Sequence, residues 1–140
     1  MKLSVIIPAY NEEATIYNIL QRVSSVELIQ GITKELVVVN DCSKDNTEGE
    51  LMRFRNDFPE ISINYQKHTV NRGKGAALHT GIQSATGDFI IVQDADLEYD
   101  PRDYPQLLEP IKEGLADVVY GSRFLGGRHR VAMFWHMVAN

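Results

Sequence analysis

The sequence predicts an α/β fold with a mostly parallel sheet flanked by helices, and two features of the chain carry that prediction. Short apolar runs alternate with longer segments in which apolar residues recur at helical spacing. The run Leu36–Val39 is apolar at every position, as expected for a strand that is covered on both faces. Alternation of this kind is typical of a parallel or mostly parallel sheet. Because the chain has no internal repeat, low-complexity segment or linker, we expect one domain over residues 1–140.

The first half of the chain alternates strands and helices from its start. Apolar side chains such as Ile16 and Leu20 define one buried face of the first helix. The second helix has three candidate capping residues at its start, Ser43, Asp45 and Asn46. The predicted strands are 3–7, 36–39 and 61–65, and the predicted helices are 12–26 and 45–58.

The second half continues the alternation and then ends differently. The pair Asp100-Pro101 opens its second helix, and Gly114 marks the end of that helix. A Gly-rich loop over 121–130 leads into 131–140, which resembles an apolar helix without a cap. We therefore expect the chain to be the N-terminal part of a longer protein, with its C-terminal part truncated. The predicted helices are 74–85 and 102–114, and the predicted strands are 89–93 and 118–120.

Composition excludes several classes of protein. The chain has 140 residues, 44% of them hydrophobic, and a net charge of −5, which argues against a nucleic-acid-binding protein. Its single cysteine, Cys42, excludes an intrachain disulfide and indicates a reducing compartment. No apolar run approaches the roughly 20 residues that cross a bilayer. The first residues lack the plan of a signal peptide, so we expect a cytoplasmic protein.

An acidic pair directly follows the fourth predicted strand. Asp94 and Asp96 are two positions apart, and alternation along a strand places such residues on the same side. Two carboxylates held together repel each other and lose hydration unless a cation lies between them. Ligands that are all oxygen suit Mg²⁺ or Mn²⁺, which usually keep positions open for substrate phosphates. The pair predicts a metal–diphosphate site, with a solvated turn as the plainer alternative.

The loops that follow the other strands narrow the kind of ligand. In open α/β sheets, ligands bind beyond the carboxyl ends of the strands. The segment 8–12, PAYNE, is not a Gly-rich turn, so a dinucleotide fingerprint and a P-loop are both absent after the first strand. The segment 73–78 matches the dinucleotide pattern only in part. After the second strand, Asp41 could accept a hydrogen bond from a base or a ribose, or could serve a turn.

Four motifs now carry a specific resemblance. PAYNE at 8–12, VVNDCSKDNT at 38–47, NRGKGAA at 71–77 and VQDADLEYDP at 92–101 occur in one order and at similar spacing. Together they resemble the nucleotide-sugar domain of the family 2 glycosyltransferases, which has the GT-A fold. Within that family the likeness is greatest to the polyprenyl- or dolichyl-phosphate mannose or glucose synthases, and GSRFLGG at 121–127 shares it. The resemblance covers essentially the whole chain.

The resemblance implies a set of donor-binding residues. Tyr10 would stack on the nucleotide base, Asp41 would bind base or ribose, and Arg123 would pair with the donor phosphates. For Glu12 the alternative is an acid favoured by the helix dipole, and for Val39 it is an ordinary core position. The implied donor-binding residues are Pro8, Ala9, Tyr10, Glu12, Val39, Asp41, Lys74, Asp94, Ala95, Asp96 and Arg123.

The resemblance also implies the metal ligands. Asp94 and Asp96 would hold Mg²⁺ or Mn²⁺, and Glu98 continues the spacing and could complete the shell, with a solvated loop acid as its alternative. The four histidines show no ligand spacing with one another and receive no metal role.

The second motif departs from the family pattern, Asp-Asp-Gly-Ser-x-Asp-Gly-Thr, at three positions. Asn46 replaces a glycine and tolerates a left-handed turn conformation. Cys42 also replaces a glycine, and there the turn geometry is expected to differ. Asn40 removes a charge.

The implied reaction is transfer of a hexosyl group, with inversion, from a UDP- or GDP-sugar to a polyprenyl phosphate or a glycan hydroxyl. A polyprenyl phosphate is already an anion and needs no strong base, whereas a hydroxyl acceptor would need a carboxylate base. No general base is evident in this chain. Contact with the inner face of a membrane is compatible with this reading, and no oligomeric state is predicted.

Two other functions remain open. A sugar-phosphate nucleotidyltransferase would carry a Gly-rich, basic signature after the first strand, which PAYNE is not. A non-catalytic nucleotide-sugar-binding domain would bind the donor without transfer. A phospho-acceptor receiver module is remote, because its acids would be expected after the first strand as well.

Overall fold

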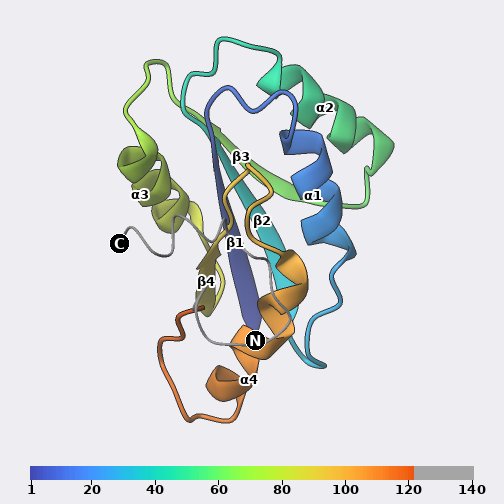
Figure 1. Ribbon diagram of the computed structural model, residues 1–140, viewed down its shortest axis with the longest axis vertical. Helices are drawn as coiled ribbons and strands as arrows, with labels where there is room; N and C mark the ends of the chain where they lie inside the picture. Colours follow the sequence, from blue (N-terminus) through green and yellow to red (C-terminus); the bar gives the residue numbers. More distant parts are fainter. Residues whose placement is uncertain (122–140) are drawn as a thin grey trace, which may run out of the picture. The chain divides into compact units, whose positions relative to one another are not determined.

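The computed structural model describes residues 1–121 and contains one parallel sheet (Figure 1). Its four strands are β1 (Lys2–Ala9), β2 (Thr33–Asn40), β3 (Ile63–Lys67) and β4 (Phe89–Val92). Their order across the sheet is β3-β2-β1-β4, and every neighbouring pair is parallel. The predicted α/β class and parallel sheet are confirmed. The predicted loop and helix over 121–140 lie beyond the described residues, except for Gly121 itself, and so does Arg123.

Helices cover both faces of this sheet. Helices α1 (Ile16–Ser25) and α2 (Thr47–Asp57) lie on one face, and α3 (Lys74–Ser84) lies on the other (Figure 1). Along β2, Val37 and Val39 face α3, where they pack with Ile6 of β1 and with Ala77. Alternate residues of the same strand face the opposite side. This explains why the run at the centre of β2 is apolar at every position.

The close approach of α3 to the sheet depends on a glycine. A Cβ atom added to Gly81 would lie 2.4 Å from Cγ2 of Ile6, which is closer than carbon atoms pack. At this turn α3 therefore packs closer to β1 than it could with any residue that has a side chain.

The chain divides into two compact units, the first comprising residues 1–105 and the second beginning at Gln106. The short 3₁₀ helix η1 (Pro101–Asp103) belongs to the first unit, and α4 (Tyr104–Lys112) begins there. No helix among residues 1–121 has the length and apolar character that a membrane-spanning segment requires.

One sequence prediction about a strand is wrong. Residues 118–120 form no strand within the described part of the chain, and the side chains of Val118 and Tyr120 are 64% and 89% exposed. A short apolar run becomes a strand only when a partner strand is available, which periodicity alone does not reveal. Among residues 1–121, β4 lies at an edge of the sheet, and its Ile90 and Val92 are 44% and 42% exposed.

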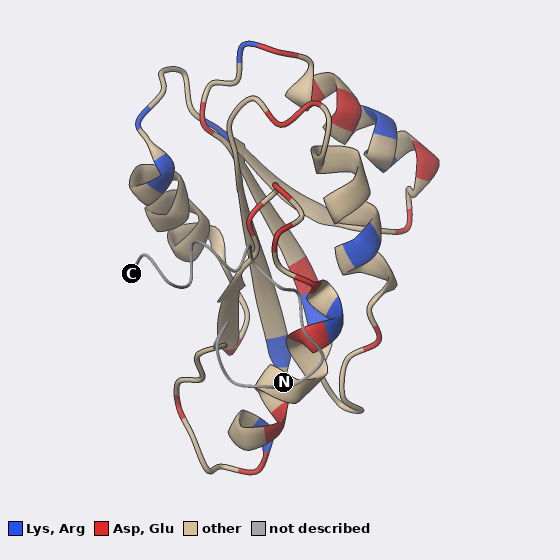
Figure 2. Ribbon diagram, viewed as in Figure 1, with Lys and Arg blue, Asp and Glu red and all other residues tan. Residues whose placement is uncertain are grey.

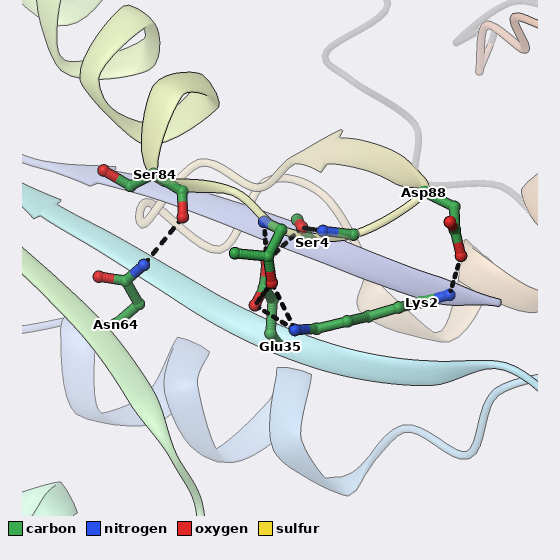
Figure 3. Close-up of polar contacts among 8 residues, drawn as sticks. Lys2, Ser4, Glu35, Asn64, Ser84 and Asp88 are labelled. Atoms are coloured by element: carbon green, nitrogen blue, oxygen red, sulfur yellow. Dashed lines mark hydrogen bonds and ion pairs between the residues drawn. The ribbon is translucent and has the colours of Figure 1, made fainter.

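A polar junction fastens the amino ends of the strands (Figure 3). The carboxylate of Glu35 in β2 accepts hydrogen bonds from Oγ of Ser4 in β1 (2.5 Å) and from N (2.6 Å) and Oγ1 (2.8 Å) of Thr86, which precedes β4. The Lys2 ammonium lies 2.6 Å from the same carboxylate. These partners come from β1, β2 and the α3–β4 connection, so this edge of the sheet is held together by its own side chains.

Candidate functional site

The carboxyl edge of the sheet contains the point where the strand order reverses. From β1 the chain moves outward through β2 and β3, and then crosses to the other side of β1 to form β4. Loops diverge at such a point and leave a crevice in which ligands bind. The loops concerned follow β1, β2 and β4, and Figure 2 shows acidic residues in each of them and a basic residue at the start of α3.

Each of these loops contains a non-glycine residue with positive φ. The φ angles are 57° at Asn11, 59° at Cys42 and 66° at Leu97. Non-glycine residues adopt this region only when the surrounding structure imposes it, and such positions concentrate at functional sites. The three loops are therefore held in specified conformations.

The loops after β1 and β2 are joined to each other by side chain–backbone hydrogen bonds. Asn11 takes part in two of them, as a backbone donor and as a side-chain acceptor. Glu13 does the same with the loop after β2. The bonds run from Asn11 N to Ser43 Oγ (3.0 Å), Lys44 N to Asn11 Oδ1 (2.8 Å), Glu12 N to Thr47 Oγ1 (2.7 Å), Glu13 N to Asp45 Oδ2 (3.0 Å) and Asn46 N to Glu13 Oε2 (2.8 Å).

These hydrogen bonds between the two loops change the roles predicted for the residues before α2. Ser43 serves the first loop rather than the helix, whereas Asp45 Oδ1 accepts a hydrogen bond from Thr47 N (3.0 Å) at the helix start. Asn46 makes no side-chain cap bond. Its φ is −85°, so Asn46 does not use the left-handed conformation that asparagine tolerates, whereas Cys42 does.

The residues of the first motif differ in exposure. Tyr10 follows β1 and is 42% exposed, so its ring is available for stacking. Ala9 is buried and Pro8 is partly buried. Glu12 is partly buried, and its carboxylate accepts a hydrogen bond from Oγ1 of Thr15 (2.6 Å). Of the four predicted donor-binding residues in this motif, Tyr10 is the exposed one.

Two of the predicted donor-binding residues lie in the interior of the protein. The side chain of Val39 is fully buried in the cluster beneath α3, and that of Ala95 is 3% exposed. Strand alternation turns the Val39 side chain toward Ala77, as its alternative interpretation, an ordinary core position, predicts. A contact between Val39 and a nucleotide base stays a prediction.

Asp41 is directed into the protein. Its side chain is 3% exposed, and Oδ1 lies 2.6 Å from Nδ1 of His68. The backbone N–H groups of Arg72 (2.9 Å) and Gly73 (2.7 Å) also donate to it. Burial alone would raise the pKa of Asp41, but the hydrogen bonds from Arg72, His68 and Gly73 outweigh it and hold that pKa below its usual value. The described contacts of Asp41 hold the segment before α3; the expected contact with a base or ribose stays a prediction.

His68, to which sequence reasoning gave no role, is the missing partner of Asp41. It is 8% exposed, and its Nε2 lies 2.9 Å from Oγ1 of Thr80 in α3. The parallel register pairs Asn40 with Lys67, so the next residues on the two strands, Asp41 and His68, lie side by side. That register was the signal that could have found the pair.

The structure explains Asn40, whose role the motif left open. Its side chain is buried, Nδ2 donates to Oη of Tyr65 (3.2 Å), and Oδ1 accepts from the N–H of Ser43 (2.8 Å). Tyr65 in turn donates to Glu48 (3.0 Å), and burial raises its pKa to about 12. An aspartate could not donate to Tyr65, so an amide suits this position.

Asp94 and Lys74, both predicted donor-site residues, lie together. The Lys74 ammonium is 2.7 Å from Oδ1 and 2.8 Å from Oδ2 of Asp94, but only Oδ2 accepts a hydrogen bond from it. Among the described residues no donor satisfies Oδ1, which is buried. The hydrogen bond to Asp94 raises the pKa of Lys74, so the lysine stays charged. A buried carboxylate oxygen without a donor is suited to a cation.

The other two predicted metal ligands are arranged differently. Asp96 is exposed, and its Oδ1 accepts a hydrogen bond from the N–H of Glu98 (3.0 Å), which closes a turn. Within residues 1–121 no three His, Cys, Asp or Glu side chains are gathered closely enough to hold a metal ion. The three-acid shell expected from Asp94, Asp96 and Glu98 is therefore not preformed. The oxygen ligands and the orphaned atom of Asp94 nevertheless fit Mg²⁺ or Mn²⁺, with further ligands supplied by a bound diphosphate.

Comparisons with known proteins agree on one family. Residues 4–139 match the model described as glycosyl transferase family 2. Dolichol-phosphate mannosyltransferase of Pyrococcus furiosus is 37% identical over 127 residues, which are 91% of this chain and 34% of that protein. Undecaprenyl-phosphate 4-deoxy-4-formamido-L-arabinose transferase of Yersinia enterocolitica is 34% identical over 118 residues, covering 84% of this chain and 36% of that protein. The chain thus spans about a third of the length of these curated relatives.

The solved structures agree with the sequence comparison. Mannosyltransferase PcManGT of Pyrobaculum calidifontis, in complex with GDP-Man and Mn²⁺, is similar with a TM-score of 0.64 and 31% identity. The likeness covers 72% of this chain and 29% of that one.

Proposed function

The chain belongs to glycosyl transferase family 2, and from this membership we propose that it forms the nucleotide-sugar-binding part of an inverting hexosyl transferase. Its parallel sheet flanked by helices is that of the GT-A fold. The proposed donor is a nucleoside-diphosphate hexose, and the proposed cofactor is Mg²⁺ or Mn²⁺.

The observation that carries the proposal is the arrangement of Asp94 and Lys74 at the strand-order reversal. A buried carboxylate oxygen that accepts no hydrogen bond from the described residues lies 2.7 Å from a charged ammonium, beyond the carboxyl end of β4. A diphosphate with a divalent cation offers complementary charges to both groups, since the cation suits the carboxylate and the phosphates suit the ammonium. A plain solvated turn would leave no buried oxygen unsatisfied.

Each side chain at the site has a physical role in this proposal. Tyr10 stacks on the base with its exposed ring, and Lys74 pairs with the donor phosphates. Asp94 and Asp96 would hold the cation, which would supply positive charge to neutralise the diphosphate leaving group. Asp41 and His68 fix the loop that presents Lys74.

The proposed acceptor is a polyprenyl phosphate. Two relatives bear names that specify dolichol phosphate and undecaprenyl phosphate, and this supports the choice over a glycan hydroxyl. A phosphate acceptor is already ionised at neutral pH, so it attacks without a strong base.

Calorimetric titration tests the donor site. GDP-mannose and UDP-sugars are titrated into the full chain with and without Mn²⁺, and into an Asp94→Asn variant. We expect binding of one nucleotide that depends on Mn²⁺ and weakens at least about tenfold in the variant, as loss of a charged partner predicts.

A matched control is Asp57→Asn, which alters an exposed carboxylate at the end of α2 that contacts Tyr17 and Arg53. This variant should bind as the wild type does. Nucleotide binding that is indifferent to Mn²⁺ and to Asp94 would contradict the proposal.

A further inference from the structure

The acidic loop after β4 is closed by the side chain of one buried residue, Gln93. Its side chain is 1% exposed, and Nε2 donates to the carbonyl oxygens of Asp94 (3.1 Å) and Tyr99 (3.3 Å). Those carbonyls belong to the two ends of the loop 94–99. A single amide group therefore ties the ends together.

The direction of this amide is fixed by Tyr104 at the start of α4. The Tyr104 hydroxyl donates to Oε1 of Gln93 (2.7 Å), and the tyrosine side chain is 2% exposed. Burial raises the pKa of Tyr104, which keeps the hydroxyl protonated and able to donate. Because Oε1 must face that hydroxyl, Nε2 must face the loop.

Without the hydrogen bonds of Gln93, the loop 94–99 is expected to change conformation, because its backbone is strained. Leu97 lies in the left-handed region with φ of 66°, which disfavours a residue with a branched side chain. Asp96 Oδ1 accepts from the N–H of Glu98, so the turn and the position of the Asp96 carboxylate are coupled. Holding the loop ends holds both Asp94 and Asp96.

We propose that Gln93, oriented by Tyr104, is a positioning residue that sets the affinity of the acidic loop for a divalent cation with a nucleoside diphosphate. The inference rests on the proposed function for its ligand. Gln93 touches neither cation nor phosphate in this account and acts through the backbone of the loop. Because its polar atoms are buried, water does not readily replace the bonds that a substitution removes.

Three variants test the hydrogen bonds of Gln93 separately. Gln93→Met fills a similar volume and removes all of them. Gln93→Glu keeps an acceptor for Tyr104 but removes the amide donor that faces the two carbonyls. Tyr104→Phe removes only the hydroxyl that orients the amide, and serves if the core variants fold poorly.

The matched control is Asn64→Leu. Asn64 also donates a side-chain amide hydrogen to a carbonyl oxygen, that of Ser84 (3.0 Å; Figure 3). It lies in β3, which β2 and β1 separate from β4 in the sheet. It should lower stability without altering the loop, and so it reports what a merely structural loss does.

Two measurements on the full chain decide the matter. The first is hydrogen exchange of the Glu98 amide without metal, which should quicken about tenfold in Gln93→Met, as loss of one net hydrogen bond implies. The second is the affinity for GDP with Mn²⁺, which should fall about tenfold, as for other residues that orient metal ligands. Tyr104→Phe should change both in the same direction and less, and Asn64→Leu should change neither.

The outcomes separate this inference from the proposed function. Unchanged Glu98 exchange, or faster exchange with unchanged GDP affinity, overturns the positioning role. Failure of the wild type to bind GDP with Mn²⁺ overturns the proposed function and with it the ligand named here. In that case the exchange result alone decides whether Gln93 closes the loop.

Discussion

Cys42 has a strained backbone conformation in the loop that follows β2. It occupies the left-handed region at a turn where the family pattern has glycine, and its Sγ lies 3.4 Å from the carbonyl oxygen of Thr69. A residue with a Cβ is disfavoured in this region by roughly 1–2 kcal/mol. The strain is borne because Asp41 before it and Ser43 after it are both fixed by hydrogen bonds.

Replacing Cys42 by glycine should therefore stabilise the fold. The relief of strain exceeds the added flexibility of the unfolded chain, and the net gain should be up to about 1 kcal/mol. Urea unfolding measures it, with Cys42→Ala as the control that keeps the strain and should bring no gain. A lower midpoint for Cys42→Gly would show that the Sγ contact outweighs the strain.

Lys74 should compete with a metal ion for Asp94. Its ammonium lies against the carboxylate that the cation needs, although the lysine side chain is 60% exposed. Lys74→Met should therefore raise the affinity for Mn²⁺ alone roughly twofold to fivefold, the range expected when an exposed ion pair is removed. The affinity for GDP with Mn²⁺ should fall, because a phosphate partner is lost.

Paramagnetic resonance titration of free Mn²⁺ measures the first effect. Lys67→Met is the matched control, since Lys67 pairs with Glu48 in a similarly exposed ion pair away from the acidic loop. Weaker binding of Mn²⁺ alone by Lys74→Met would mean that the lysine supports the metal ligands instead of competing with the ion.

At the residue scale, the sequence predicted which residues belong to the candidate site better than it predicted where their side chains point. Asp94 and Lys74 were both named as donor-binding residues, but their direct ion pair was not predicted. The inward direction of Asp41 was not predicted, because alternation tells which face a side chain takes but not what covers that face. His68 and Gln93 were missed because their partners lie on other elements.

At the scale of elements, the two edges of the sheet are built differently. At the amino edge Glu35 joins β1, β2 and the segment before β4 through its own bonds (Figure 3). At the carboxyl edge the loops after β1 and β2 are joined to each other, while the buried Oδ1 of Asp94 has no donor among the described residues. Side-chain bonds thus stabilise the fold at the amino edge, whereas a carboxylate at the carboxyl edge can bind a ligand.

Glu35 should make stability depend on pH in the acid range. Burial alone would raise the pKa of Glu35, but hydrogen bonds from Lys2, Ser4 and Thr86 lower it from 4.5 to about 2. Because the folded pKa lies below the unfolded one, the stabilisation is present above about pH 4.5 and is lost as the pH falls toward about 2. Glu35→Gln should therefore flatten the fall of unfolding free energy across that window.

Urea unfolding at several pH values between these limits measures the slope. Glu60→Gln, which alters an exposed side chain near the same edge, is the control and should keep the slope of the wild type. Equal slopes for Glu35→Gln and the wild type would show that the junction is not an ionic one.

Elements with strong periodicity were predictable, and those that depend on distant partners were not. The helix with apolar residues at 16, 19, 20 and 23 buries that face as expected. The parallel sheet follows from the run at the centre of β2. The strand expected over 118–120 is absent from the described residues because the sequence could not supply its pairing. The exposure of β4 likewise depends on its place at the sheet edge.

At the scale of the whole molecule, the chain carries the part of a family 2 glycosyltransferase that holds the proposed donor site. It spans about a third of the length of the curated relatives it matches, and its likeness to a mannosyltransferase bound to GDP-Man and Mn²⁺ covers 72% of the chain. Every residue assigned to the proposed site, apart from Arg123, lies within the compact unit 1–105. The proposed acceptor role concerns the complete protein.

The central claim is that a divalent cation and a nucleoside diphosphate bind together at the carboxyl edge of the sheet. Nuclear magnetic resonance of the ¹⁵N-labelled chain with GDP and substoichiometric Mn²⁺ tests it most directly, because the paramagnetic ion broadens signals of nearby amides. The account predicts loss of signal over 94–98 and 73–75, with Ser4, Glu35 and Thr86 at the opposite edge unaffected. Broadening centred on the amino edge, or spread evenly over the chain, would contradict it.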